Sequence, residues 1–329
     1  MMKTEGKLFD SLVRWNFLKP ETKGLMIIEP KTKGFNAFAW VKNNENSLKD
    51  CLRKFGGILL RGFDIYAVSE FNKIVQILYP NLLEYVYRST PRTKLGGKIY
   101  TATEYPANRV IPIHNENSYS KKWPKIIFFF SVIVPLEGGE TPIADSRKIY
   151  QKIDQSIREK FESKGLNYVR NYNVGIDLSW QEVFQTDNKE EVNQYCKDNG
   201  IDYEWKNCGG TELKTTEFCQ ASIIHPVTGE PVWFNQAHLF HISALKENDK
   251  FDFIREVGEE NLPRNVFYGD GSPIENESLE HIRRIYEEEK IKFKWRKGDI
   301  MILDNILMAH GRETYLGERK IAVAMTEDS

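Results

Sequence analysis

The sequence predicts a mostly β fold of the α+β class, a barrel or jelly roll with flanking helices and a long insertion. Short segments rich in apolar and β-branched residues begin near residue 98 and return near residue 291. The stretch between them, about 148–290, mixes polar helices with short strands and has no repeat. Because no Ser-, Pro- or Gly-rich linker divides the chain, we expect one domain over 1–329, with a barrel core from about 57–147 and 291–327.

The first 80 residues carry a helix–strand–helix pattern. Ser47 can cap a helix whose apolar residues follow helical spacing as far as Gly56. An apolar strand over residues 58–61 comes directly after it. A second helix then begins near Ser69 and ends before Pro80. We expect these elements to support the barrel.

The segment from residue 98 to residue 147 is predicted to form strands of a sheet, because it contains the short β-rich runs IYTAT, VIPIHNENSY and IIFFFSVIV. The last run is apolar throughout, which is typical of a strand buried on both faces. Gly138 and Gly139 indicate a tight turn and not a phosphate loop, since the Gly-Lys-Ser/Thr ending is absent. Asp145 or Ser146 can then cap a long helix that runs to about Lys164.

The remaining residues alternate between polar helices and strands. Helical patterns cover residues 190–197 and 278–290, and the run EPVWFN is typical of a short strand. Three β-rich segments end the chain, with the sequences IKFKW, DIMILD and RKIAVAM. We expect these segments to pair with the strands near residues 98–147 and to complete the barrel.

Composition excludes several functional classes. Hydrophobic residues make up 40% of the chain and the net charge is −1, so the protein is expected to be globular, without the basic field of a nucleic-acid-binding protein. The longest apolar run, 126–136, is shorter than the roughly 20 residues that span a bilayer. The four cysteines are widely spaced, and the N-terminus has no apolar signal segment. We expect a reduced, cytoplasmic protein whose partner is a small molecule; the oligomeric state stays open.

Three residues are candidates for holding one metal ion. His114 and Glu116 lie two apart in a strand-like segment, so both side chains are expected on one face. His310 follows an apolar strand and can supply a third ligand. Two imidazoles and one carboxylate form the facial triad of non-haem iron(II) oxygenases, which leaves coordination positions open, whereas a structural zinc site leaves none.

Several neighbouring residues are open to two interpretations. Asn115, Ser118 and Arg312 are candidates for contact with the substrate. Asn115 is expected to point away from the metal, and Ser118 shares the face of His114 and Glu116 only if the strand continues. Structural hydrogen bonding is an equal alternative to substrate contact for Asn115 and Ser118. Arg312 is either a surface charge or a residue at the pocket mouth. His238 and His241 are more consistent with ordinary packing than with a second metal site.

Four segments of the chain resemble the TauD/TfdA-like branch of the 2-oxoglutarate-dependent dioxygenases, and within it the SyrP-like group. They are TEYPANRVIPIHNENSY, WPKIIFFF through GGETPIADSR, YGDGSPIENESLEHIRRIYEEE, and WRKGDIMILDNILMAHGRETYLGERKIAVAM. The resemblance implies a double-stranded β-helix of cupin-like form, iron(II) and the co-substrates 2-oxoglutarate and oxygen. It also implies that His114, Glu116 and His310 are the metal ligands, with Glu where many relatives have Asp.

The resemblance further implies a site for the distal carboxylate of 2-oxoglutarate. A guanidinium and a hydroxyl suit this group, and Arg319 and Thr141 match those roles, with Lys320 as the rival of Arg319. Val323 and Ala324 stand where relatives carry a further Arg, so taurine is a poor substrate candidate.

The resemblance implies hydroxylation of an unactivated C–H bond in an amino acid or similar small acid, free or on a carrier protein, in natural-product biosynthesis. The carboxylate of Glu116 argues against halogenation. Desaturation, epoxidation or cyclisation by the same oxidative chemistry is the first alternative. A non-catalytic barrel that binds a metabolite or a carrier protein is the second.

Overall fold

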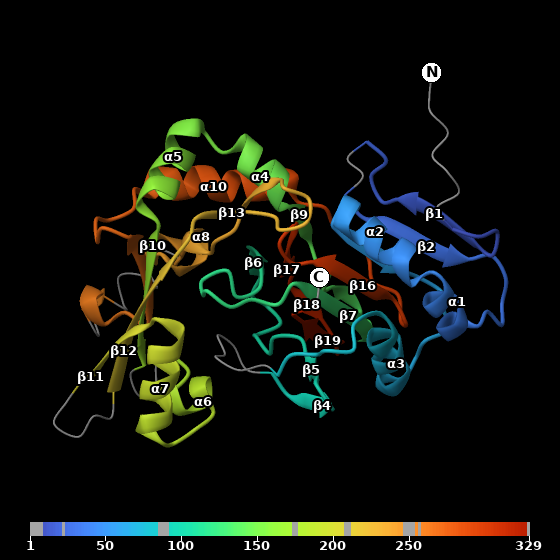
Figure 1. Cartoon of the computed structure of the whole chain (residues 1–329), viewed down its shortest axis with the longest axis horizontal. Helices are drawn as coiled ribbons and strands as arrows, with labels where there is room; N and C mark the ends of the chain where they lie inside the picture. Colours follow the sequence, from blue (N-terminus) through green and yellow to red (C-terminus); the bar gives the residue numbers. More distant parts are fainter. Residues whose placement is uncertain are drawn as a thin grey trace.

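The computed structural model describes residues 9–21, 24–84, 92–172, 177–206, 212–245, 254–255 and 258–327. Cys208 and residues 1–8 therefore lie outside the described residues. Figure 1 shows the main sheet beside the helices of the N-terminal part, with the long middle segment of the chain on the other side. Within the described residues, no helix is both long and apolar enough to span a membrane.

The largest sheet has eight strands in the order β1-β2-β3-β16-β7-β19-β5-β4 and joins both ends of the chain. Neighbouring strands are antiparallel, except β2 and β3, which are parallel. The predicted mostly β core is confirmed. In sheet order the strands are β1 (Val13–Phe17), β2 (Met26–Pro30), β3 (Gly57–Leu60), β16 (Ile300–Asp304), β7 (Ile126–Ile133), β19 (Lys320–Thr326), β5 (Ile99–Thr101) and β4 (Lys94–Gly96).

Three helices cover one face of this sheet. They are α1 (Ala37–Asn43), α2 (Glu45–Phe55) and α3 (Val68–Leu78). Phe128 and Phe130 of β7 pack against this helical layer, whereas Phe129 points into the opposite core. The strand is thus buried on both faces, as its apolar run predicted. Strands β1 and β2 and helix α1 were not predicted, and α2 begins before Ser47.

A smaller sheet lies across the other face and carries two of the candidate ligands, His114 and His310. Its order is β6-β17-β9, formed by β6 (Ile111–His114), β17 (Met308–Arg312) and β9 (Ile143–Asp145). A hairpin of β8 (Glu137–Gly138) and β18 (Tyr315–Leu316) adjoins it. Phe129, Val323 and Met325 of the large sheet share one hydrophobic core with Ile143 and Met308 of the smaller one. This core is the jelly-roll interior.

The middle of the chain builds a further layer around the four-stranded sheet β11-β12-β10-β15. Its hydrophobic core includes Ile113 and Ala309 from the smaller sheet, so it is continuous with the region of the ligands. The division into a barrel core and an insertion stays a prediction. The elements are α4 (Ser146–Lys152), α5 (Gln155–Lys164), β10 (Leu166–Tyr172), α6 (Trp180–Phe184), α7 (Lys189–Asn199), β11 (Asp202–Lys206), β12 (Glu212–Cys219), β13 (Ser222–Ile224), β14 (Pro231–Trp233), α8 (Ala237–Phe240), two 3₁₀ turns (Ile242–Ala244 and Glu259–Asn261), β15 (Arg264–Tyr268) and α10 (Asn276–Glu289).

The predicted single helix from residue 145 to residue 164 is wrong. It is divided into α4 and α5, because Ile153 adopts an extended conformation and is buried. The guanidinium of Arg158 donates to the carbonyl oxygens of Tyr150 and Ile153 at 3.0 and 2.6 Å, which satisfies acceptors that the helix end leaves open.

The predicted strand IKFKW is also wrong. Ile291 forms an isolated bridge with Ile143, and residues 292–295 have no ladder partner in the structure. Phe293 and Trp295 are nevertheless buried at alternate positions, which explains the strand-like pattern in the sequence.

Candidate metal centre

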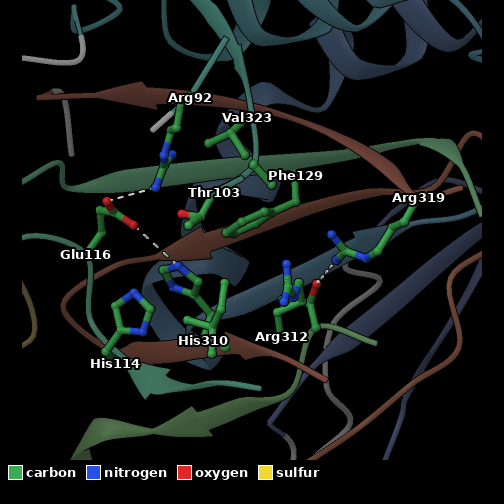
Figure 2. Close-up of a pocket in the computed structure, with 13 residues that line it drawn as sticks. Arg92, Thr103, His114, Glu116, Phe129, His310, Arg312, Arg319 and Val323 are labelled. Atoms are coloured by element: carbon green, nitrogen blue, oxygen red, sulfur yellow. Dashed lines mark hydrogen bonds and ion pairs between the residues drawn. The ribbon is translucent and has the colours of Figure 1, made fainter. Parts of the chain in front are cut away.

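His114 and His310 are neighbours because of the register between two strands. β6 and β17 are antiparallel, and these two residues lie directly opposite each other. Their ring centroids are 4.9 Å apart, and the ring of Phe129 lies 4.9 Å from His310 on the wall of the pocket. Figure 2 shows both imidazoles below Glu116. Two residues almost 200 positions apart in the chain are thus brought together by one strand pair.

Glu116 reaches the same point from a turn, contrary to the prediction that it lies on a strand. β6 ends at His114, and Asn117 has a left-handed backbone with φ of 56°. The side chain of Asn305 holds this turn by accepting from the backbone N–H of Glu116 at 2.7 Å and donating to its carbonyl oxygen at 3.0 Å. A buried side-chain clamp therefore directs the carboxylate toward the two imidazoles.

The three side chains have the arrangement of a metal site. One ligand atom from each of His114, Glu116 and His310 lies within 4.8 Å of the others. Nδ1 of His114 is 2.8 Å from the carbonyl oxygen of Pro112, which fixes the ring and leaves Nε2 for an ion. Nδ1 of His310 is buried and has no hydrogen-bond partner among the described residues. Two nitrogens and one oxygen fit iron(II) with open coordination positions.

Protonation favours ligation. Burial, and then the neighbouring His310, lowers the pKa of His114 to about 4, so its imidazole is neutral at pH 7. Burial alone would raise the pKa of Glu116, but the positive charge of Arg92 and the nearby imidazole of His310 outweigh it and hold that pKa well below its usual range. Neutral imidazole and ionised carboxylate are the forms that bind a metal ion.

Arg92 was missed by the sequence analysis. Its Nη2 donates to Oε1 of Glu116 at 2.9 Å, and both side chains are almost completely buried. Oε2 of Glu116 lies 3.6 Å from Nε2 of His310. Figure 2 shows Arg92 reaching Glu116 from the side opposite to His114. No motif in the sequence marks this arginine, because it lies 24 positions before its partner.

Thr141 and Arg319 line the same pocket as the three candidate ligands. Nη2 of Arg319 donates to Oγ1 of Thr141 at 3.3 Å, and its Nε donates to the carbonyl oxygen of Gly139 at 2.9 Å. Burial lowers the pKa of Arg319 to about 10, which still leaves it charged at pH 7. Lys320 begins β19 opposite Ile133 and is not part of the pocket wall. The geometry favours Arg319 over Lys320.

The tight turn at Gly138 and Gly139 is present as predicted. Both residues have positive φ values, 68° and 70°. A Cβ atom at Gly139 would lie 2.9 Å from Cδ of Arg319, and one at Gly138 would lie 2.2 Å from the carbonyl oxygen of Thr314. Glycine at this turn therefore allows the close approach of Arg319.

Arg312 is buried and lines the pocket, so it is not a surface charge. It donates to the carbonyl oxygens of Tyr105, Pro106 and Arg109 at 2.6 to 2.8 Å. These bonds tie the loop before β6 to the end of β17. Arg312 holds the pocket edge through backbone contacts.

Asn115 and Ser118 hold the turn and do not line the pocket. Nδ2 of Asn115 donates to the carbonyl oxygen of Asn305 at 2.6 Å and to Oγ of Ser146 at 3.0 Å. Oγ of Ser118 donates to the carbonyl oxygen of Asn115 at 2.9 Å. Asn115 points away from the metal site, as predicted. The contacts favour structural hydrogen bonding for both residues over contact with a substrate.

Helix α8 supports His114 from the middle of the chain. Nε2 of His238 lies 2.9 Å from the carbonyl oxygen of Ile113, and Nε2 of Gln236 donates to that of Asn115 at 2.8 Å. These carbonyls flank His114. The ring of His238 also stacks on Tyr286, with a centroid distance of 4.5 Å. Because His241 instead contacts Ser243, the two histidines have packing and hydrogen-bonding roles and do not form a second metal site.

Comparison with known proteins agrees with this geometry. The family model described as "Taurine catabolism dioxygenase TauD, TfdA family" matches residues 21–325. The chain belongs to the TauD/TfdA family. It is therefore an iron(II)- and 2-oxoglutarate-dependent dioxygenase, and the predicted double-stranded β-helix class is confirmed.

Two curated relatives match over most of the chain. The dapdiamide synthesis protein DdaC of Enterobacter agglomerans is 40% identical over 284 residues, 86% of each chain. A clavaminate synthase-like protein of Arabidopsis thaliana is 30% identical, over 87% of this chain and 86% of its own. Among solved structures, PvcB of Pseudomonas aeruginosa has the same fold, with a TM-score of 0.58 and 16% identity over 99% of this chain and 95% of its own.

Proposed function

We propose that the protein hydroxylates an unactivated C–H bond of an amino acid or similar small acid in natural-product biosynthesis. His114, Glu116 and His310 would hold iron(II), and Arg319 with Thr141 would bind the distal carboxylate of 2-oxoglutarate. The observation that carries this proposal is the clustering of the three ligand atoms within 4.8 Å in a pocket that also contains the Arg319–Thr141 pair.

Each residue of the proposed site has a separate task. The imidazoles and the carboxylate bind the ion, and the guanidinium of Arg319 offers the paired N–H donors that a carboxylate accepts. Phe129 and Val323 lie between Arg319 and the triad in Figure 2 and give the pocket an apolar wall that excludes water. When bound, iron(II) with 2-oxoglutarate supplies oxygen activation coupled to decarboxylation of the keto acid, with succinate and carbon dioxide as co-products.

The names of similar proteins support the biosynthetic part of the proposal. DdaC is a dapdiamide synthesis protein, and PvcB is an iron- and α-ketoglutarate-dependent oxygenase from an isonitrile synthetic pathway. A substrate bound to a carrier protein is compatible with this context, as is membership of the SyrP-like group. We further expect a cytoplasmic protein, in keeping with the free thiols of Cys51, Cys196 and Cys219, and cell fractionation tests this.

Two alternative functions can be distinguished from hydroxylation by experiment. The same site could desaturate, epoxidise or cyclise its substrate, because the outcome depends on which substrate atoms face the metal. Product analysis by mass spectrometry separates these reactions from hydroxylation. A non-catalytic binding barrel would leave 2-oxoglutarate unconsumed; the intact clustering of His114, Glu116 and His310 argues against it.

The first experiment tests the metal site directly. Purified protein receives iron(II) and 2-oxoglutarate without oxygen, and its visible spectrum is recorded. We expect the weak charge-transfer band of a chelated keto acid in the wild type and its loss in His310→Ala. His281→Ala is the matched control, because His281 lies near Asp154 and outside the pocket, so its band is expected to persist. A correctly folded wild type without the band would disprove the proposal.

A further inference from the structure

The segment that follows α10 is buried without belonging to a sheet. Phe293 and Trp295 are each 5% exposed, although residues 292–295 have no ladder partner in the structure. Polar groups in a buried segment of this kind need hydrogen-bond partners outside a ladder. The indole of Trp295 carries one such group, and its partner lies in the pocket of the candidate metal centre.

Arg61 and Asp299 fix the path of the backbone around Trp295. Nη2 of Arg61 donates to the carbonyl oxygen of Lys294 at 2.8 Å and to Oδ2 of Asp299 at 2.6 Å. The same carboxylate oxygen accepts from the backbone N–H of Arg296 at 2.8 Å. The side chains of Arg61 and Asp299 are 11% and 1% exposed. Because Lys294 and Arg296 are the chain neighbours of Trp295, these bonds hold the backbone from which its indole extends.

The indole N–H of Trp295 ends on the hydroxyl of Thr141. Nε1 of Trp295 donates to Oγ1 of Thr141 at 3.1 Å, and Thr141 is 2% exposed. Nη2 of Arg319 donates to the same oxygen at 3.3 Å, the contact marked by the dashed line at Arg319 in Figure 2. Indole and guanidinium nitrogens donate and do not accept, and a hydroxyl has two lone pairs and one hydrogen. Both lone pairs of the Thr141 hydroxyl are therefore engaged.

The hydrogen of the Thr141 hydroxyl remains available to donate. Both hydrogen bonds that its oxygen makes with the described residues are accepted ones, so the hydrogen has no acceptor among those residues. A buried donor without an acceptor costs free energy. Thr141 lines the pocket together with Arg319 and the three candidate ligands, so an acceptor in the pocket would remove this cost. A carboxylate suits the position, because an ionised carboxylate only accepts hydrogen bonds.

We propose that Trp295 is a positioning residue for the co-substrate, whose indole N–H orients the Thr141 hydroxyl so that it donates to the distal carboxylate of 2-oxoglutarate. This inference rests on the proposed function, because Thr141 and Arg319 form the carboxylate site of that proposal. With Trp295 and Arg319 on its lone pairs, the hydroxyl is held in one orientation. Accepting these hydrogen bonds also polarises the O–H group and makes it a stronger donor. Trp295 is not among the described residues that line the pocket, so it acts through Thr141.

The test is a double-mutant cycle on the anaerobic full-length protein with iron(II), in which the visible band gives the Kd for 2-oxoglutarate. Trp295→Phe keeps an aromatic ring and removes the N–H donor, Thr141→Val removes the hydroxyl, and Thr141→Ser retains it. Each Thr141 variant is also combined with Trp295→Phe. Trp40→Phe is the matched control, because Trp40 is similarly buried and its Nε1 donates to Oδ1 of Asp10, outside the pocket.

Two further measurements accompany the cycle. Urea unfolding verifies that each variant folds, and a titration of Mn(II) tests the metal site. If Trp295→Phe does not fold, Trp295→Met takes its place, since methionine also lacks the donor and fills irregular space in a core.

We expect Trp295→Phe to raise the Kd for 2-oxoglutarate about 5-fold, the effect of one hydrogen bond. In the Thr141→Ser background Trp295→Phe raises this Kd by a similar factor, because the hydroxyl is retained. In Thr141→Val, where no hydroxyl remains, Trp295→Phe has no further effect. The Kd for Mn(II) is unchanged in every variant, and Trp40→Phe binds 2-oxoglutarate as the wild type does.

Three results overturn the inference. An unchanged Kd for 2-oxoglutarate in Trp295→Phe shows that the indole N–H does not support binding of the co-substrate. An equal loss from Trp295→Phe in Thr141→Val and in the wild type shows that Trp295 acts independently of Thr141. A loss that also falls on Mn(II), or that Trp40→Phe reproduces, assigns the effect to general destabilisation. Absence of the visible band in the wild type instead refutes the proposed function, and this inference with it.

Discussion

Replacing the amide side chain of Asn305 tests how the fold positions Glu116, because this side chain bonds the backbone of Glu116. Asn305 is fully buried, accepts from the N–H of Glu116, and donates to the carbonyl oxygens of Glu116 and Pro124 at 3.0 and 2.8 Å. Asn305→Ala removes three hydrogen bonds worth about 1 kcal/mol each, so we expect the free energy of unfolding to fall by about 3 kcal/mol. Because the turn then loses its clamp, we also expect metal affinity to fall about 10- to 100-fold.

The assay combines urea unfolding of the metal-free protein with titration of Mn(II) into the folded protein. Asn171→Ala is the matched control, because buried Asn171 also makes three hydrogen bonds, to Glu260, Leu262 and Lys206, far from the triad in sequence. It should lose similar stability, about 3 kcal/mol, and keep its metal affinity. Equal loss of metal affinity in both variants would refute the reasoning, since the effect would then reflect stability alone.

Three further predictions concern the pocket and its support. Arg319→Ala should weaken 2-oxoglutarate binding about 30-fold, measured by titration, and Lys320→Ala should not; a larger loss at Lys320 would reverse the assignment. Gly139→Ala should also weaken 2-oxoglutarate binding, because its Cβ would displace Arg319; unchanged affinity would count against the close approach. Burial lowers the pKa of His238 to about 3. Below pH 6.5 the histidine is therefore protonated in the unfolded chain but stays neutral in the folded chain, which favours unfolding. The unfolding free energy should therefore fall by about 2 kcal/mol between pH 6.5 and 5 from this residue. His238→Gln should remove that share of the fall, measured by urea unfolding, and leave the share of His114, whose pKa is also lowered; an unchanged slope would contradict the buried neutral state.

Strand β7 and the tight turn at Gly138 and Gly139 were predictable because their signals are local. The apolar run of β7 requires burial on both faces, and the hairpin with Gly138 and Gly139 requires positive φ. The failures also have local causes. The alternating burial of residues 291–295 imitates a strand, although hydrogen bonding there is limited to one bridge. Helix α4 ends at Ile153 without a proline or glycine to mark it.

The sequence analysis placed Glu116 beside His114, where the structure also has it, but it assigned Glu116 to a strand and not to the turn in which it lies. Period-2 alternation would place Glu116 and His114 on one face, but β6 ends at His114 and the turn with Asn117 returns the carboxylate to the pocket. The contact with Asn305 that maintains this turn spans 189 positions. No pattern within the segment contains that information.

The sequence by itself indicated the candidate ligand types, two imidazoles and a carboxylate, and its resemblance to the TauD/TfdA family indicated a guanidinium and a threonine for the co-substrate. Tertiary structure decided how they work together. It placed His310 opposite His114 by strand register, directed Glu116 through Asn305, and brought Arg92 to the same carboxylate. The physical reason is that ligand type is a property of single residues, whereas distances and charge compensation depend on contacts between residues far apart in the chain.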